Sequence, residues 1–178
     1  MDRFLEEVVT KRNRGFDEAL YWLSLLVMVV FGVMAVMNFM VLGMGTNFLY
    51  HLIMMVATGG IAVYTFFARD KLRTEYEYTF TNGSIDFAMV YNNKRRKNLG
   101  ALNVVKVDAF GRVNSGSFHR HTSAPDVKHL RWFLNRDAEL YYFAFSKEGK
   151  KSIIVFEPSE EMVGHIKHYL PRGVYQEN

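Results

Sequence analysis

Cysteine is absent from this chain of 178 residues, and proline occurs only three times. Without cysteine the chain has no disulfide bond, no thiol nucleophile and no cysteine-based zinc or iron–sulfur site. Charge is also missing from a long internal stretch, because no Asp, Glu, Lys or Arg lies between Glu18 and Arg69. This uncharged stretch, rather than the average composition, decides the class of protein.

The uncharged stretch is too long for one membrane-crossing helix. A single helix over residues 19–68 would be about 75 Å long, whereas the hydrocarbon core is about 30 Å thick and takes about 20 apolar residues to cross. Residues 43–47, Gly-Met-Gly-Thr-Asn, are polar and flexible enough to form a turn. The sequence therefore predicts a transmembrane hairpin within residues 18–70, with spans near 20–42 and 48–68.

Positive charges lie at both outer ends of this predicted hairpin, and the turn between the spans has none. Lys and Arg are enriched on the cytoplasmic side of membrane proteins. We therefore expect a multi-pass protein of the cell membrane with two spans and both termini in the cytoplasm. The flanking cations are Lys11, Arg12, Arg14, Arg69, Lys71 and Arg73.

Other interpretations of the apolar stretch fit less well. A cleaved signal peptide has an apolar region of only about 7 to 15 residues, and a buried hairpin of a soluble protein would show a polar face. Asn38 and His51 are polar, but a hydrated position near the outer surface explains them better than a transport role. Small residues in both spans permit close packing within the hairpin and leave homodimerisation through the same faces open.

Residues 1–17 are expected to form a cytoplasmic amphipathic segment. Phe4, Leu5, Val8 and Val9 follow helical spacing, with charged residues between them. This spacing predicts a short helix along the inner membrane surface, and a frayed helix is the alternative.

After Thr74 the apolar residues alternate, which is typical of β-strands. Asn82-Gly83 favours a tight hairpin between a first strand and a second strand in which Ile85, Phe87, Met89 and Tyr91 alternate. We expect two further short strands, then a polar stretch, then a short helix or strand, a second hairpin and a carboxy-terminal amphipathic helix. The two short strands are expected at 94–102 and 104–109 and the polar stretch at 111–126. The short helix or strand is expected at 127–134, the second hairpin at 140–156 and the final helix at 158–170.

Strands in two groups closed by one helix resemble the pleckstrin-homology-like (PH-like) barrel. The chain also looks like an uncharacterised family of small two-helix membrane proteins of Gram-positive bacteria, through residues 76–83, 94–97, 156–158 and 170–172. The resemblance implies an α+β architecture, in which the transmembrane hairpin precedes a cytoplasmic PH-like β-barrel or sandwich at 71–178 closed by a C-terminal α-helix. It implies no catalytic activity.

Between residues 94 and 136, ten Lys and Arg residues face only two Asp residues. On a domain tethered below the inner leaflet, each cation close to anionic lipid gains about 1 kcal/mol. A solvated surface without a ligand is the alternative, and nucleic acid is disfavoured because no recognition motif occurs. The predicted lipid- or anion-binding residues are Lys94, Arg95, Arg96, Lys97, Arg112 and Arg120.

Catalytic and metal-binding motifs are missing from the sequence. There is no His-Glu-x-x-His, Gly-x-Ser-x-Gly, phosphate loop or dinucleotide fingerprint. The closest metal-like spacings, in residues 119–121 and 161–168, lack a complete ligand set. We therefore expect no enzyme activity, no metal, no cofactor and no small-molecule substrate.

Taken with the predicted anchor, these features suggest a binding or scaffolding module that contacts membrane lipids or another membrane protein. The alternative is a small structural subunit of a larger membrane complex, in which the transmembrane helices make the specific contacts.

Overall fold

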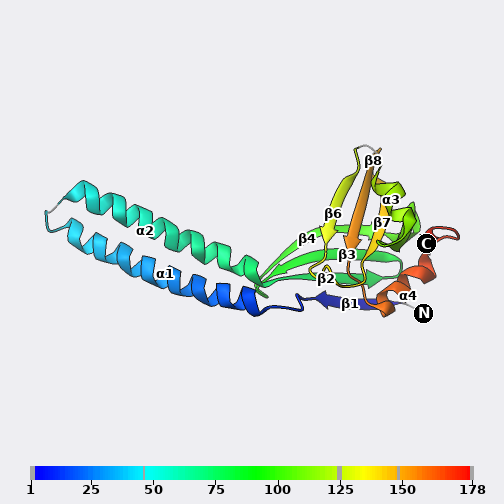
Figure 1. Cartoon of the computed structure of the whole chain (residues 1–178), viewed down its shortest axis with the longest axis horizontal. Helices are drawn as coiled ribbons and strands as arrows, with labels where there is room; N and C mark the ends of the chain where they lie inside the picture. The colour runs from blue at the N-terminus through cyan, green and yellow to red at the C-terminus, as the bar shows by residue number, and fades with distance from the viewer. Residues whose placement is uncertain (1–2, 46, 124–125, 148, 177–178) are drawn as a thin grey trace. The chain divides into compact units, whose positions relative to one another are not determined.

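The computed structural model describes residues 3–45, 47–123, 126–147 and 149–176. The chain divides into two compact units (Figure 1). Residues 13–74 form the helix unit, and residues 1–12 together with 75–178 form the β unit. The helix unit is therefore an insertion within the sequence of the β unit.

Two long helices make up most of the helix unit. Helix α1 spans Gly15–Leu42, helix α2 spans Phe48–Ala68, and a 3-10 helix, η1, follows at Arg69–Arg73. At 1.5 Å per residue α1 is about 42 Å long and α2 about 32 Å long. Both are long and apolar enough to cross a membrane. The two expected helices are confirmed, although α1 begins five residues before Leu20. Thr46 of the predicted turn lies outside the described residues.

Two polar side chains, Asn38 of α1 and His51 of α2, form a hydrogen bond between the helices. His51 Nδ1 lies 2.9 Å from Asn38 Oδ1, and the Asn38 amide donates to the carbonyl of Met34 at 2.8 Å. Gly59 permits close packing, because a Cβ at that position would lie 3.7 Å from the Cβ of Ala35. Mutual hydrogen bonding thus explains both polar side chains within the hairpin.

At the other end of the hairpin, an ion pair joins the helices. Arg73 donates to both carboxylate oxygens of Glu18, at 3.0 and 2.5 Å, and its guanidinium lies 3.6 Å from the centre of the Tyr21 ring. Tyr21 is buried under this contact. Side-chain interactions therefore link α1 to α2 near one end of the hairpin and α1 to η1 near the other.

The N-terminal segment is a strand, so the helix predicted there is wrong. Strand β1, Phe4–Val9, pairs antiparallel with strand β2, Thr74–Thr81. Leu5 and Val9 pack against the core, whereas Phe4 and Val8 are 62% and 53% exposed. As an edge strand this short segment forms backbone hydrogen bonds to β2, whereas a helix of this length is marginal in water. Residues 1–17 were expected to form a separate segment, but residues 1–12 belong to the β unit.

Sheet A has four strands in the order β1-β2-β3-β4. Strand β3 spans Ser84–Tyr91 and strand β4 spans Arg95–Asn103. The hairpin predicted at Asn82-Gly83 is confirmed, because both residues have positive φ, 46° and 87°.

A bulge in sheet A changes the expected alternation of β3. The register shifts between Phe87 and Ala88, opposite Gly100, which has a φ of 147°. Ala88 and Val90 are buried as well as Phe87, while Met89 is only half-buried. The simple period-2 pattern therefore holds only for the first half of this strand.

The region after β4 differs from its prediction. Residues Val104–Lys106 form a 3-10 turn, η2, instead of a strand, because the Asn103 side chain accepts a hydrogen bond from the Val105 N–H at 2.9 Å. Strand β5 then spans Ala109–Arg112. Helix α3, Gly116–Thr122, lies in the stretch expected only to be polar. Side-chain capping of a backbone donor favours a turn over a strand here.

Sheet B has five strands in the order β6-β8-β7-β5-β9. The second predicted hairpin is confirmed, whereas the final short strand was not predicted. The strands are β6 at Lys128–Trp132, β7 at Tyr141–Lys147, β8 at Lys150–Phe156 and β9 at Tyr175–Gln176.

Helix α4, Glu160–Tyr169, supplies Met162, Val163 and Ile166 to the core between the sheets. Its start is capped, because the Ser159 side chain accepts a hydrogen bond from the Met162 N–H at 3.1 Å. The two sheets do not close into the barrel that was one form of the prediction. An α+β architecture with two sheets and a packed C-terminal helix is what the structure shows.

Tyr78 connects the two sheets through the core. Its side chain is fully buried, and its hydroxyl donates to the backbone carbonyl of Trp132. Its ring meets those of Phe87 and Phe156 edge-on, with centroids 5.5 Å away in each case. Burial raises the pKa of the Tyr78 phenol, so the folded protein keeps it protonated.

Replacing Tyr78 with Phe should lower the free energy of unfolding by about 1 to 3 kcal/mol, because a buried carbonyl loses its donor. In the wild type, the raised pKa of Tyr78 contributes to the free energy of unfolding. This contribution is fully present below about pH 10 and is lost as the pH rises further, because Tyr78 ionises at lower pH in the unfolded chain than in the folded protein. Urea unfolding at pH 8 and pH 11 should therefore show a smaller alkaline loss in Tyr78→Phe. Tyr91→Phe, at a half-buried position, is the control, and an equal alkaline loss in all three proteins would refute the assignment.

Candidate functional site

The predicted basic turn lies between β3 and β4. We use this name for Lys94 to Lys97, all four of which are exposed. Asn92 and Asn93 precede it with φ of 49° and 53°, the left-handed conformation that Asn tolerates well. The register places Arg96 opposite Val90, while Arg95 and Lys97 are opposite Tyr91 and Met89. Successive cations of β4 therefore point to opposite faces of sheet A.

Arg96 is neutralised within the sheet. Its Nη2 lies 2.8 Å from Oε2 of Glu77, and the Glu77 side chain is largely buried. Arg95 lies over the Tyr91 ring, with 6.0 Å between its Cζ and the ring centre. Glu77 therefore neutralises one of the four positive charges of the basic turn.

The position of the basic turn follows from the strand directions. Val9, at the end of β1, is opposite Tyr76, near the start of β2. Because β3 runs back along β2, the β3–β4 turn lies at this same end of sheet A. The chain leaves the β unit after residue 12 and returns at residue 75. Both connections to the helix unit therefore start from the end of the sheet that carries the basic turn.

Arg112 and Arg120 belong to other elements. Arg112 is on β5 in sheet B, where its Nε is 2.5 Å from a carboxylate oxygen of Glu139 and donates to the Tyr141 hydroxyl at 3.2 Å. Arg120 is exposed on α3. The six predicted residues thus lie on three different elements, and their binding role stays a prediction.

A second group of cations was not identified from the sequence. Lys147 and Lys150 are directly opposite each other at the tip of the β7–β8 hairpin, Lys151 follows, and Lys128 of β6 is opposite Ser152. All four, which we call the hairpin lysines, are exposed. The available signal was three lysines around Gly149, whose φ of 77° marks a tight turn.

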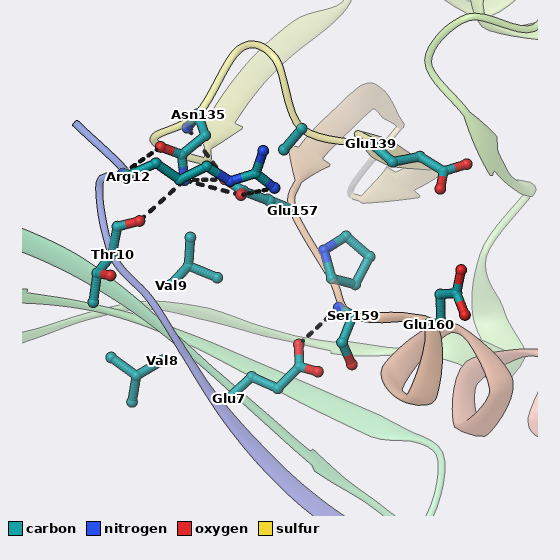
Figure 2. A pocket seen from close by; sticks show the side chains of 12 residues that line it. Glu7, Val8, Val9, Thr10, Arg12, Asn135, Glu139, Glu157, Ser159 and Glu160 are labelled. Atoms are coloured by element: carbon teal, nitrogen blue, oxygen red, sulfur yellow. Dashed lines mark hydrogen bonds and ion pairs between the residues drawn. The ribbon is translucent and has the colours of Figure 1, made fainter.

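A pocket of about 560 Å³ lies where β1 ends, beside the β6–β7 loop and the start of α4 (Figure 2). Asn135 is buried there and holds the backbone that follows β1: its Oδ1 accepts from the Arg12 N–H at 2.8 Å, and its Nδ2 donates to the Thr10 carbonyl at 3.0 Å. Glu157, whose side chain is 11% exposed, accepts from the Asn135 backbone N–H at 3.1 Å and from Nδ2 at 2.9 Å. We call this arrangement the Asn135 bracket.

The same pocket contains a further contact to β1, since Glu7 accepts a hydrogen bond from the Ser159 N–H at 3.1 Å (Figure 2). Four glutamates and one arginine are among its lining residues. This excess of carboxylates opposes anion binding, so the pocket is better suited to holding β1 than to binding a lipid phosphate. The contacts to Glu7, Thr10 and Arg12 join residues more than a hundred positions apart, and no local sequence pattern indicates them.

The histidines considered as metal ligands have other surroundings. The His165 ring lies 5.9 Å from that of Phe80, and the His121 ring lies 6.0 Å from that of Tyr142. Across the residues that the structure describes, no three His, Asp or Glu side chains come together in a way that could hold a metal ion.

Asn135→Ala removes the bracket and should lower the free energy of unfolding by about 2 to 4 kcal/mol, because it breaks several hydrogen bonds, including those to the Glu157 carboxylate. Chemical denaturation of the full chain in detergent measures this loss. Asn114→Ala, at an exposed turn position, is the matched control and should change stability by less than about 0.5 kcal/mol. Equal stabilities of the two variants would contradict the role assigned to the bracket.

Comparison with known proteins places the chain in a family. No curated protein and no solved structure matches it. A family model described as a bacterial PH-like domain (DUF6106), a family of unknown function, matches residues 1–176. The match covers β1, the helical insertion and both sheets, which agrees with the resemblance seen in the sequence. The chain therefore belongs to the bacterial PH-like domain family.

Proposed function

We propose that this protein is a non-catalytic binding or scaffolding module, anchored in the cell membrane by α1 and α2, whose β unit contacts anionic lipid headgroups on the cytoplasmic side. The observation that carries the proposal is the insertion of two apolar helices between adjacent strands, at the end of sheet A that bears the basic turn. Membership in a PH-like family supports a binding role over a catalytic one.

The surface of the helices supports a membrane location. Large apolar side chains are exposed on both, including Phe39, Leu49 and Ile53. An apolar surface of this extent is unfavourable in water and favourable in lipid. Cations flank the outer ends of both helices, which supports cytoplasmic termini.

Short connections support the lipid contact. Residues 10–14 link β1 to α1, and residues 69–73 of η1 link α2 to β2. These segments are too short to carry the near end of sheet A far from the membrane surface. Lys94, Arg95 and Lys97 then lie within reach of the headgroups, and at most about 1 kcal/mol per cation gives about 3 kcal/mol in total.

A second candidate function is that of a small subunit in a larger membrane complex. It is favoured by Gly32 and Gly60, because a Cβ at either position would meet no atom within 4 Å. Such open positions allow a helix of another chain, or of a second copy, to approach closely. Crosslinking in native membranes followed by identification of stoichiometric partners distinguishes this function from lipid binding by the β unit.

The topology is tested by cysteine labelling, which is unambiguous because the chain has no native cysteine. A membrane-impermeant maleimide should label Asn47→Cys in intact cells and should label Asn92→Cys only after lysis. The reason is the placement of flanking cations in the cytoplasm. Labelling of position 92 from outside would refute the proposed orientation.

The lipid contact is tested with a fluorophore on Asn93→Cys in nanodiscs. A nitroxide attached to the lipid headgroup should quench the fluorophore more strongly in discs containing phosphatidylserine than in discs of phosphatidylcholine. Raising the salt concentration to physiological should reduce this difference, because exposed charges are then screened beyond a Debye length of about 8 to 10 Å. Replacing Lys94, Arg95 and Lys97 by Ser should remove the difference.

Two controls accompany this measurement. Arg96→Ser should have a smaller effect than any of the three other single replacements, because Glu77 already neutralises Arg96. A fluorophore on Thr81→Cys reports the opposite end of sheet A and should be quenched less. Equal quenching in discs with and without anionic lipid would contradict the lipid contact and favour the subunit function.

A further inference from the structure

Arg69, the first charged residue after the apolar part of α2, has a side chain without an acidic partner. Its Nε is buried and has no hydrogen-bond acceptor among the described residues. Within the same part of the chain, Arg69 forms no ion pair with a carboxylate. A buried donor without an acceptor is costly, above all when the group is charged. A ligand that supplies an oxygen atom to Nε would remove this cost.

Two aromatic rings lie against the guanidinium of Arg69. Its Cζ is 5.0 Å from the centre of the Phe66 ring and 5.8 Å from the centre of the Tyr21 ring. Both distances lie within the range of cation–π contacts. An aromatic ring attracts a cation but brings no negative charge, so these contacts position the guanidinium without neutralising it.

Arg73 shows what the same side chain does when the chain supplies an acceptor. Its Nε and Nη2 donate to the two carboxylate oxygens of Glu18, and its guanidinium lies 3.6 Å from the centre of the Tyr21 ring. Two arginines therefore lie beside one buried tyrosine, and of the two only Arg73 has a carboxylate among the described residues. The Nε that Arg73 uses for Glu18 is the atom that has no acceptor in Arg69.

The nearby carboxylates do not neutralise Arg69. Glu18 is bound by Arg73, and Asp17 and Asp70 interact with residues other than Arg69. The helix unit, residues 13–74, contains four Lys and Arg residues and three Asp and Glu residues. The one positive charge in excess agrees with an arginine that has no acidic partner in the described part of this unit.

The location of Arg69 suits the phosphate of a lipid. With α1 and α2 in the membrane as proposed above, the apolar stretch ends at Ala68, so Arg69 lies where the hydrocarbon meets the headgroups. A guanidinium binds a phosphate through two parallel hydrogen bonds, as Arg73 binds the Glu18 carboxylate. Exposed apolar side chains adjacent in sequence to the two rings, Trp22 and Phe67, are available to an acyl chain.

We infer that Arg69 binds the phosphate of one phospholipid through Nε and Nη, at the end of the hairpin where α1 begins and α2 ends. Tyr21 and Phe66 hold the guanidinium in place, and the ligand chemistry is that of a lipid phosphodiester. The site consists of residues of the helix unit alone. It rests on the proposed membrane location but not on the lipid contact of the basic turn.

Native mass spectrometry of the full chain in a mild non-ionic detergent tests this site, with phosphatidylglycerol as the probe. The wild type should bind one phosphatidylglycerol molecule per chain. In Arg69→Lys the lipid concentration for half occupancy should rise about tenfold, because Lys keeps the charge but cannot form two parallel hydrogen bonds. Arg69→Lys retains a cation at the membrane boundary, and its far-ultraviolet circular dichroism should equal that of the wild type.

Lys71→Gln is the matched control, because it removes an exposed positive charge two residues from Arg69 and should change half occupancy by less than about twofold. Replacing Lys94, Arg95 and Lys97 by Ser, the variant that tests the basic turn, should leave the bound lipid in place. Loss of the headgroup contact by the β unit and loss of the lipid at Arg69 are therefore separate results.

Diacylglycerol distinguishes binding of the phosphate from adhesion of acyl chains to the apolar helices, because it has the same acyl chains and no phosphate. It should not compete with phosphatidylglycerol for the wild type. Equal binding of the two lipids, absence of bound phospholipid in the wild type, or equal affinities of wild type and Arg69→Lys would overturn the inference.

Discussion

Pairing of β1 with β2 is the constraint on which the rest of this structure depends. The two strands are adjacent in sheet A although the whole helix unit lies between them in the sequence. Their register fixes where the chain leaves and returns, and it places both connections at one end of the sheet. The Asn135 bracket and the Glu7–Ser159 hydrogen bond secure β1 to sheet B and α4 as well. Two apolar helices inserted in this way are attached to the β unit at two points of its backbone, unlike a helix attached to one terminus.

The distribution of charge over the β unit separates its surfaces by chemistry. The pocket beside the end of β1 has an excess of carboxylates, whereas the basic turn and the hairpin lysines are positive. Pairing within the chain reduces the nominal charge of the positive regions, because Glu77 holds Arg96 and Glu139 holds Arg112. Counts of Lys and Arg in the sequence therefore overstate what an external anion encounters.

Local patterns predicted much of the fold. The two long helices, the Asn82-Gly83 hairpin, β2 and α4 each depend on residues close in sequence, and the structure confirms them. Prediction failed where distant residues decide the outcome. The apolar residues of β1 fit helical spacing and do not alternate, because Glu6 and Glu7 are adjacent, so pairing with β2 decides for a strand. The Asn135 bracket, β9 and the surroundings of Arg69 likewise need the tertiary structure, so only the basic turn of the candidate sites could be found from sequence.

The most direct test of the central claim is a disulfide between β1 and β2 in the full chain, which has no native cysteine. Glu6 and Thr79 are directly opposite each other in the register, and such pairs fall within disulfide geometry. Glu6→Cys combined with Thr79→Cys should oxidise readily in membranes and migrate as a crosslinked monomer. Glu6→Cys combined with Asp86→Cys should not, because β2 separates β1 from β3. If both proteins fold and neither pair forms a crosslink, the pairing of β1 with β2 is contradicted, and the N-terminal segment is separate from the β unit.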